Sequence, residues 1–339
     1  MNILITGGAG FIGVNSAHYF AKNGHRVVIF DNLLRDGSGK NLEWIKSECD
    51  VEFFKGDLRK FVDLADLFNK NEKFDLILHL AAQVAVTTSV TDPYEDFEIN
   101  ALGTFNLLEA TRKYNPDAAF IYSSTNKVYG EMEDLDIVER NGRYIYGKLN
   151  DGVDENRNLD FHSPYGCSKG AADQYCRDYH RIYGLQTIVL RQSCIYGYRQ
   201  FGIEDQGWVA WFCIATALGR SIKIYGDGKQ TRDVLFIDDL ISVFDLAYEK
   251  RKQVAGKIFN IGGGGKNTLS LHELIDKLEK LKGKKIPLEY NSWRPGDQKV
   301  FVGNIALAKN VLGWEPTISP DAGVEMLYNW VTKNIYLFE

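Results

Sequence analysis

A phenol and an ammonium group stand four residues apart in the segment YGCSK, at Tyr165 and Lys169. This spacing is about one helical turn, so a helix here would present both side chains on one face. A tyrosine with a pKa of ~10 is a poor base at neutral pH, but a neighbouring cation favours its phenolate. The pair could therefore take a proton from a substrate hydroxyl and return it, although Tyr-x-x-x-Lys also arises by chance in ordinary helices.

Hydroxyl side chains precede this pair in the segment IYSSTNKVYG, residues 121–130. The apolar residues before them predict a strand at 119–123 that ends in this segment. Ligands of doubly wound parallel sheets gather at the carboxyl ends of the strands. A hydroxyl at this edge could therefore share a proton with Tyr165.

A glycine-rich turn, TGGAGFIG at 6–13, follows the first predicted strand and opens the first predicted helix. The Gly-x-Gly-x-x-Gly pattern alone is a weak signal, because such turns also serve only to reverse the chain. In this position the glycines would let the backbone approach a pyrophosphate, whose charge the N–H groups of the helix start would stabilise. The expected contacts are Gly7, Gly10, Phe11, Ile12 and Gly13.

Two carboxylates follow at the ends of later strands. Asp31 lies 18 residues beyond Gly13 (31 minus 13), close to the spacing of the acid that binds the adenosine ribose. A carboxylate there repels a 2′-phosphate, so NAD is favoured over NADP. Asp57 could bind the adenine edge, or it could equally cap a helix. Asn32 and Leu58, beside these two acids, complete the expected adenosine site.

Short β-branched runs alternate with longer helical patterns along the first half of the chain. This alternation predicts βαβ units in an α/β fold of the Rossmann type, with a doubly wound parallel sheet. The expected strands lie at 2–6, 26–30, 76–80, 119–123 and 187–190, and the expected helices at 11–23, 64–69, 101–114 and 165–183.

After residue 191 the rhythm loosens into aromatic and glycine-rich stretches, with an amphipathic helix expected at 270–281. We expect a cofactor domain at 1–190 and a smaller C-terminal substrate-binding lobe at 191–339. The two would be interleaved, because segments near 229–262 and 300–312 are expected to return to the cofactor domain. A charged insert at 131–160 has few core-like positions, and we expect it to cover an entrance.

The composition disfavours several classes of protein. A net charge of −5 over 339 residues argues against non-specific nucleic-acid binding, which needs a basic surface. Without an apolar run of ~20 residues or a leader segment, the chain is expected in the cytoplasm. The five cysteines, an odd number without Cys-x-x-Cys, indicate free thiols. No metal site is expected, since Cys176 and His180 lack a third ligand.

Together these segments resemble the extended short-chain dehydrogenases/reductases, in the group of nucleotide-sugar epimerases and dehydratases. The resemblance extends from Met1 to about Trp314 and includes HLAAQ at 79–83. It implies a Rossmann-type domain with NAD as cofactor. The further cofactor contacts that it implies are Leu80, Ala81, Ala82, Gln83, Asn100, Ser123, Tyr165 and Lys169.

The resemblance also implies catalytic roles. Tyr165 would exchange the proton of a sugar hydroxyl, while Lys169 would orient the ribose and lower the pKa of the tyrosine. Thr125 would be the assisting hydroxyl. In this family the segments GDGKQTRDV at 226–234 and RPGD at 294–297 bind the nucleotide and diphosphate of the substrate.

Substrate contacts are expected along the whole chain. Arg232 and Arg294 would bind the diphosphate, although either could instead be a surface ion-pair partner. Trp208 could shape the sugar pocket or, with Trp211, form core. His162 could line the same pocket or cap the turn that follows it. The full expected set is Gln83, Thr125, Asn126, His162, Gln192, Ser193, Gln206, Gly207, Trp208, Val209, Tyr225, Arg232, Arg294 and Asp297.

Two details narrow the reaction. Sugar 4,6-dehydratases of this family carry Thr-Asp-Glu where this chain has Thr125-Asn126-Lys127, so the acid and base that expel water are absent. STNKVYG at 124–130, DFHSPYGCSK at 160–169 and DQGWV at 205–209 instead resemble the CDP-sugar 2-epimerases of the group. Cys194 replaces an asparagine that contacts the diphosphate in many epimerases, which implies a different grip on the substrate.

This resemblance implies oxidation of C2 in a CDP-linked sugar to a 2-keto sugar, followed by reduction on the opposite face. The expected substrates are CDP-paratose and CDP-tyvelose, with CDP-glucose and CDP-mannose as further candidates. NAD is expected to stay bound through turnover. Two alternatives remain, a UDP-sugar 4-epimerase and a non-catalytic NAD-binding regulatory protein, of which the second usually lacks the tyrosine or the lysine. The family also implies a homodimer formed by the helices at 100–114 and 165–183.

Overall fold

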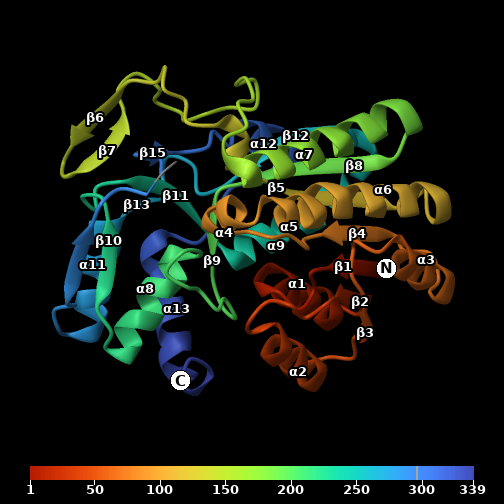
Figure 1. Ribbon diagram of the computed structural model, residues 1–339, viewed down its shortest axis with the longest axis horizontal. Helices are drawn as coiled ribbons and strands as arrows, with labels where there is room; N and C mark the ends of the chain where they lie inside the picture. Colours follow the sequence, from red (N-terminus) through yellow and green to blue (C-terminus); the bar gives the residue numbers. More distant parts are fainter. Residues whose placement is uncertain (295–296) are drawn as a thin grey trace. The chain divides into compact units, whose positions relative to one another are not determined.

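A seven-stranded sheet is built from the strands expected in the first half of the chain and from later ones (Figure 1). Its strand order is β12-β8-β5-β4-β1-β2-β3, and the pairs from β3 to β5 run parallel. The bounds are β1 Asn2–Thr6, β2 Arg26–Asp31, β3 Glu52–Lys55, β4 Leu76–His79, β5 Ala119–Thr125, β8 Gln186–Gln192 and β12 Ile258–Ile261. The predicted α/β Rossmann-type class is confirmed.

The computed structural model describes residues 1–294 and 297–339. Pro295 and Gly296 of the predicted RPGD segment lie outside the described residues. The chain divides into two units. The first comprises Met1–Val128, Phe161–Arg191 and Ile241–Phe259, and the second comprises Tyr129–Asp160, Gln192–Leu240 and Asn260–Glu339.

Helices of the first unit pack on the central strands, which are nearly continuous apolar runs because both sheet faces are covered. One buried cluster joins Leu64, Leu107 and Cys176, from three different helices, to Leu4 and Ile77 of the sheet. The bounds are α1 Phe11–Lys22, α2 Ser38–Glu48, α3 Phe61–Lys70, α4 Val86–Thr91, α5 Pro93–Phe97, α6 Gly103–Tyr114, α7 Ser163–Tyr183, α9 Ile237–Glu249 and α10 Arg251–Val254.

Predicted and observed elements agree to within a few residues at most ends. The largest difference is at the helix expected at 64–69, which begins at Phe61. The helix expected at 101–114 begins at Gly103, because a π-helical turn, η1 Glu98–Leu102, comes directly before α6. A short 3-10 helix, η2 Asn126–Tyr129, follows β5. Both irregular turns come next to expected site residues, and π-helical turns are often found at functional sites.

The described residues of the second unit form three small sheets. β10 pairs with β14, β6 pairs with β7, and β11 pairs with β9, β13 and β15. The bounds are β6 Ile137–Arg140, β7 Arg143–Tyr146, β9 Cys194–Tyr196, α8 Trp208–Leu218, β10 Ile222–Tyr225, β11 Thr231–Phe236, β13 Thr268–Ser270, α11 Leu271–Lys282, β14 Leu288–Asn291, β15 Val300–Phe301, α12 Ala306–Leu312, α13 Pro320–Lys333 and η3 Ile335–Leu337.

Two sequence expectations differ from this arrangement. The segment 229–262 returns in part, since residues 241–259 belong to the first unit and β12 joins the seven-stranded sheet, but β11 and β15 pair with each other outside that sheet. The insert at 131–160 contains the β6–β7 hairpin, and it buries Tyr146 and Val153. Its strands are too short to show a clear alternation of apolar residues, so the hairpin could not be predicted from the sequence pattern.

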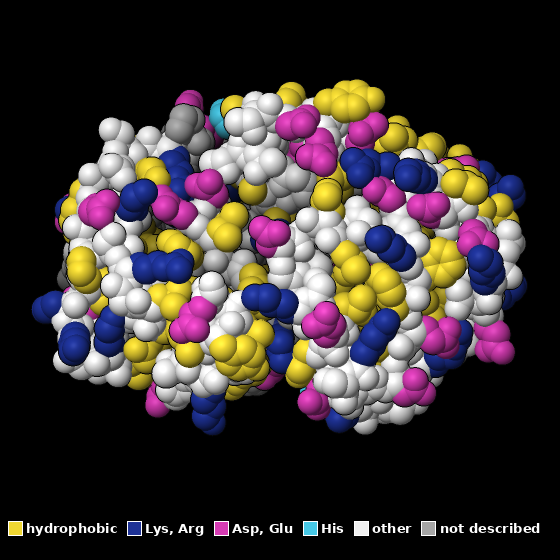
Figure 2. Space-filling model, turned by 60° about the horizontal axis from the view of Figure 1, so that its bottom comes forward, with side chains coloured by type: hydrophobic (Ala, Val, Ile, Leu, Met, Phe, Trp, Pro, Cys, Tyr) yellow, Lys and Arg dark blue, Asp and Glu magenta, His cyan; other side chains and the backbone are white. Residues whose placement is uncertain are grey.

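The described residues also bear on membrane spans, thiols, metal ligands and surface charge. None of their helices is long and apolar enough to cross a membrane. All five cysteines are free thiols. His, Cys, Asp and Glu residues within residues 1–294 and 297–339 form no group of three or more that could hold a metal ion. Basic and acidic side chains are interspersed over the face shown in Figure 2.

Candidate active site

The glycine turn is closed by backbone contacts that leave no room for side chains. Gly7 has a φ of +67°, and a Cβ atom there would lie 2.6 Å from the backbone nitrogen of Ala81. A Cβ atom on Gly13 would lie 2.2 Å from the carbonyl oxygen of Gly7. The strand β1, the turn after β4 and the start of α1 can therefore meet only if these two residues are glycines.

The start of α1 is open to an anion. Gly10 is the N-cap residue and offers no side-chain cap, and the first turn contains no acidic residue. Among the described residues, no acceptor binds the N–H groups of Phe11 and Ile12. Free N–H groups and the positive end of the helix dipole are what a pyrophosphate needs. The residues present therefore fit the phosphates of a dinucleotide.

Asp31, at the end of β2, ties the glycine turn to its own loop. Its carboxylate accepts hydrogen bonds from the N–H groups of Ala9 at 3.1 Å and Leu33 at 2.8 Å. Burial raises the pKa of Asp31, and these two hydrogen bonds act against the rise. A carboxylate held in place by backbone groups is a suitable acceptor for ribose hydroxyls.

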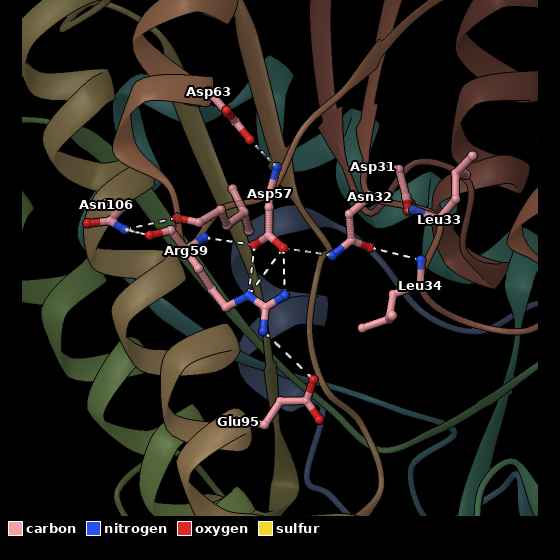
Figure 3. Close-up of polar contacts among 10 residues, drawn as sticks. Asp31, Asn32, Leu33, Leu34, Asp57, Arg59, Asp63, Glu95 and Asn106 are labelled. Atoms are coloured by element: carbon pink, nitrogen blue, oxygen red, sulfur yellow. Dashed lines mark hydrogen bonds and ion pairs between the residues drawn. The ribbon is translucent and has the colours of Figure 1, made fainter.

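Asp57, after β3, lies in the group of polar side chains drawn in Figure 3. The Arg59 guanidinium donates to both carboxylate oxygens of Asp57, with Nη2–Oδ2 at 2.7 Å, and Asn32 Nδ2 donates to Oδ2 at 3.2 Å. Burial acts to raise the pKa of Asp57, but the hydrogen bonds from Arg59 and Asn32 lower it to about 2. The alternative role as a helix cap is not observed, because Lys60 is the N-cap residue of α3.

Arg59 was not among the residues expected from the sequence. Besides Asp57 it contacts Glu95 of α5, with Nη1–Oε1 at 3.8 Å. The expected Leu58 is buried next to it, and its carbonyl oxygen accepts from Asn106 of α6 at 2.9 Å. These contacts fix the loop after β3 on helices α5 and α6.

The turn after β4 carries Leu80, Ala81, Ala82 and Gln83. Asn100 holds this turn by two hydrogen bonds: the N–H of Gln83 donates to Asn100 Oδ1 at 3.0 Å, and Asn100 Nδ2 donates to the Gln83 carbonyl at 3.1 Å. The expected residues Gln83 and Asn100 are thus brought together. An asparagine suits this place because it can donate to and accept from a backbone at once.

The expected catalytic side chains come together within the first unit. Tyr165 and Lys169 are both buried on α7, and Thr125 is buried at the end of β5. The hydroxyl of Thr125 lies close enough to Tyr165 to lower the pKa of its phenol. The ammonium of Lys169 donates to the carbonyl oxygen of Ser123 at 2.6 Å and lies 4.4 Å from the ring centre of Tyr122.

The pKa values of Tyr165 and Lys169 differ from what their spacing in the sequence suggested. Burial raises the pKa of Tyr165 to about 12, while the Thr125 hydrogen bond and the charge of Arg35, in the loop after β2, act against the rise. Burial lowers the pKa of Lys169 to about 8. Burial therefore has the largest effect on the pKa of the phenol, and the cation that lowers this pKa is Arg35, not the expected Lys169.

A buried ion pair supports the end of β5. Asp173 of α7 and Arg191 of β8 pair through Nε–Oδ2 and Nη2–Oδ1, each at 3.0 Å, and both side chains are buried. Ser124 donates to Asp173 Oδ2 at 2.7 Å. Asn126, also buried, accepts from the Thr125 hydroxyl at 3.3 Å. The hydroxyl-bearing segment is thereby fixed from two sides.

Expected anion-binding residues lie in the second unit, and both arginines are paired with carboxylates. Arg232 of β11 is buried and contacts Asp297, with Nη2–Oδ1 at 2.7 Å. Arg294 pairs with Asp205 at 2.8 Å, and its guanidinium lies 3.8 Å from the ring centre of Tyr225. An incoming diphosphate would have to compete with these carboxylates.

Other expected substrate residues of the second unit gather at the start of α8. Gly207 is the N-cap residue, with a φ of +80°, and Trp208 and Val209 open the helix, preceded by Gln206. The indole N–H of Trp208 is buried and has no hydrogen-bond partner among the described residues. Trp208 itself is only half-buried, so it is not part of the closed core.

The remaining expected substrate residues lie on different elements. Ser193 donates to the buried Asp233 of β11, and Gln192 is buried at the end of β8. His162 is exposed before α7 and makes no side-chain cap, so the capping alternative is not observed.

Comparison with known proteins agrees with this geometry. The NAD dependent epimerase/dehydratase family matches residues 3–262. A CDP-paratose 2-epimerase from Salmonella typhi is 46% identical over 338 residues, which cover 98% of this chain and 100% of the relative.

Solved structures agree as well. A UDP-glucose 4-epimerase from Thermotoga maritima, with UDP-glucose, is similar at a TM-score of 0.85 and 32% identity, covering 99% of this chain and 100% of the other. A UDP-glucuronic acid 4-epimerase from Bacillus cereus, in complex with UDP-glucuronic acid and NAD, is similar at a TM-score of 0.84 and 30% identity, covering 98% and 99%. This chain therefore belongs to the NAD dependent epimerase/dehydratase family.

Proposed function

We propose that this chain is an NAD-dependent epimerase that inverts C2 of a CDP-linked sugar, with CDP-paratose and CDP-tyvelose as its substrate pair. The observation that carries the proposal is that α7 holds Tyr165 and Lys169 buried against the end of β5, where Lys169 donates to the carbonyl oxygen of Ser123 at 2.6 Å. The full-length similarity to a CDP-paratose 2-epimerase supports the choice of substrate.

The first unit supplies the groups that hold NAD. The N–H groups of Phe11 and Ile12 would bind the pyrophosphate, Asp31 the adenosine ribose, and Asp57 the adenine amine. Lys169 would orient the second ribose. When bound, NAD accepts a hydride from the sugar carbon and returns it to the opposite face of the same carbon.

Tyr165 is the proposed base. Its phenolate oxygen takes the proton from the C2 hydroxyl as the carbon is oxidised and gives it back on reduction. The Thr125 hydroxyl lowers the pKa of Tyr165 and so favours the phenolate. Since burial places the resting pKa at about 12, the phenol needs further positive charge nearby to become a base at neutral pH.

The residues beside Thr125 argue for inversion without loss of water. Asn126 is buried, accepts a hydrogen bond from the Thr125 hydroxyl and cannot exchange a proton at neutral pH. Lys127 stands where a dehydratase needs a carboxylate base. Elimination of water would therefore lack the carboxylic acid and the carboxylate base that a dehydratase has at positions 126 and 127. Inversion at C2 does not need these two groups.

The second unit is proposed to bind the nucleotide diphosphate. Arg232 and Arg294 would exchange their carboxylate partners for phosphate oxygens, which Arg binds in the same bidentate way. The unpartnered indole N–H of Trp208 would donate to the substrate. Firm binding of the nucleotide, with few contacts to the sugar, would let the keto sugar rotate in the site and present its opposite face without dissociating.

A homodimer is proposed through α6 and α7. Apolar side chains of these helices are exposed, with Phe105 of α6 at 37% and, on α7, Tyr175 at 47%, Tyr183 at 53% and Ile182 at 65%. A contiguous exposed apolar face is typical of an interface. Light scattering of the purified chain would give twice the monomer mass of 38.4 kDa, and a monomer would refute this. The cytoplasmic location stays a prediction.

The test of the function is a substrate comparison. Incubation with CDP-paratose, CDP-glucose and UDP-glucose, followed by NMR of the products, should show inversion at C2 of the CDP-linked sugars and no change at C4 of UDP-glucose. Inversion at C4 of UDP-glucose alone would replace this proposal by a UDP-sugar 4-epimerase. No turnover of any of the three, with NAD bound, would favour a regulatory protein.

A further inference from the structure

A carboxylate that no role above uses, Asp96, is completely buried in α5, directly before the π-helical turn η1. Three side chains donate hydrogen bonds to it: Ser168 Oγ to Oδ2 at 2.5 Å, Asn100 Nδ2 to Oδ1 at 3.0 Å and Gln83 Nε2 to Oδ1 at 3.2 Å. Burial raises the pKa of Asp96, and the hydrogen bond from Ser168, the charge of Lys169 and the hydrogen bond from Asn100 act against the rise. Burial of a charge held only by neutral donors is costly, so the position calls for a physical reason.

Ser168 connects Asp96 to the proposed catalytic pair. It lies on α7 between Tyr165 and Lys169, and its hydroxyl also contacts the carbonyl oxygen of Tyr165 at 3.2 Å. Asn100 Nδ2 approaches the same hydroxyl at 3.2 Å. Since α5 and η1 both pack against α7, the Asp96 carboxylate fixes the helical turn that carries both groups.

Gln83 and Asn100 connect the same carboxylate to the cofactor turn after β4. Gln83 Nε2 donates to Asp96, while the backbone of Gln83 exchanges two hydrogen bonds with the side chain of Asn100. One carboxylate therefore accepts from the turn expected to meet the cofactor and from the helix expected to do the chemistry. Their mutual placement depends on it.

The negative charge of Asp96 also acts on the pair. The pKa of Tyr165 is raised by burial and further by Asp96, and is lowered by Thr125 and Arg35. The pKa of Lys169 is lowered by burial and raised by Cys176 and Asp173 of its own helix and by Asp96. His79 of β4 and Tyr122 of β5 also face this group. Asp96 thus favours the charged lysine and the protonated tyrosine.

We propose that Asp96 is a positioning residue of the epimerase: it fixes the Tyr165/Lys169 turn to the cofactor turn through Ser168, Asn100 and Gln83, and it places a negative charge beside both groups. This inference rests on the proposed function, because it assigns Asp96 a part in that site.

The decisive variant is Asp96→Asn. The amide oxygen can still accept from Gln83 and Asn100, and the amide N–H can donate to Ser168, whose hydroxyl then acts as the acceptor. The charge alone is lost. Without it, the phenolate forms more easily and the ammonium less easily, so both limbs of the pH profile of kcat/KM move to lower pH. The ratio of kcat/KM at pH 6 to that at pH 8 should rise about threefold or more.

Asp92→Asn is the matched control. Asp92 is the exposed N-cap residue of the same helix and accepts from the N–H of Glu95 at 2.9 Å. Asparagine caps helices as well as aspartate does, so this variant should keep the wild-type pH profile. The same charge is removed from the same helix, four residues away from the buried site.

Ser168→Ala separates position from charge. It removes the link to α7 but leaves the carboxylate, so kcat should fall about tenfold or more with the limbs of the pH profile unmoved. It also serves if Asp96→Asn does not fold. A Ser168→Ala enzyme with the kcat of the wild type would overturn the positioning role.

A readout without turnover completes the test. NMR of protein labelled with 13C at the tyrosine ring carbon next to the hydroxyl follows Tyr165, whose signal is the one missing in Tyr165→Phe. In Asp96→Asn this signal should titrate at lower pH than in the wild type. An unchanged titration and unchanged limbs would overturn the inference while leaving the proposed function intact. If the Tyr165 signal shifts between wild type and Asp96→Asn as expected, but the wild type turns over no nucleotide sugar, the proposed function would be wrong instead.

Discussion

Gly13→Ala is the sharpest test of the cofactor loop. The added Cβ would lie 2.2 Å from the Gly7 carbonyl oxygen and 2.5 Å from the Gly8 Cα. Ordinary contact begins at 3.4 Å, so the backbone of the turn must move by about an ångström. Forced overpacking of this kind costs about 1–3 kcal/mol. Because the moved atoms are those that approach the pyrophosphate, NAD binding should weaken by about ten- to a hundredfold.

The assay is the amount of NAD that stays with the purified protein, measured by mass spectrometry after denaturation, together with calorimetric titration of NAD into stripped protein. Gly39→Ala is the control, since a Cβ on this helical, exposed glycine meets nothing within 4 Å and alanine favours a helix. Gly39→Ala should retain NAD as the wild type does. If Gly13→Ala binds NAD with wild-type affinity, the assignment of this turn to the pyrophosphate is wrong.

Three further predictions concern catalysis and stability. Tyr165→Phe should lower kcat by about 10²–10⁴-fold with NAD content unchanged, and a loss below tenfold would argue against a proton role. Asp173→Ala leaves Arg191 buried without its partner and should cost about 3–5 kcal/mol in urea unfolding, whereas Asp66→Ala, in an exposed pair, should cost about 1 kcal/mol or less; equal costs would contradict the structure. Burial raises the pKa of Asp233 from 3.8 to about 6, so this group contributes stability that is present below pH 4 and is lost as pH rises through 6. Asp233→Asn should therefore lose less stability than the wild type between pH 4 and pH 7, and parallel losses would refute the raised pKa.

Local signals were enough to predict the strand, the glycine turn and the helix of the candidate cofactor site. The turn at 6–13 is a short segment whose strand, glycines and helix follow one another directly, and β1 lies where the apolar run 2–6 predicted it. The acid at the end of β2 could be identified by spacing alone. These features depend on residues that are close together in the sequence, so the local sequence pattern is enough to predict them.

Contacts between distant segments could not be predicted. Asp96 stands in the segment DPYED, which suggests a surface turn, and its burial comes from partners at positions 83, 100 and 168. Arg59 and Arg35 likewise follow strands as ordinary polar loop residues. The sequence also placed Lys169 beside Tyr165 as a source of positive charge, but it did not reveal that burial of both groups raises one pKa and lowers the other.

In the proposed reaction, C2 of the sugar gives a hydride to NAD and receives the same hydride back. The most direct measurement uses CDP-paratose carrying deuterium at C2, turned over by the purified protein in ordinary water. We predict that the inverted product keeps the deuterium at C2, as seen by NMR and mass spectrometry, with no hydrogen taken up from water at that carbon. Replacement of the deuterium by solvent hydrogen would mean that C2 is deprotonated instead of oxidised, and it would contradict this account.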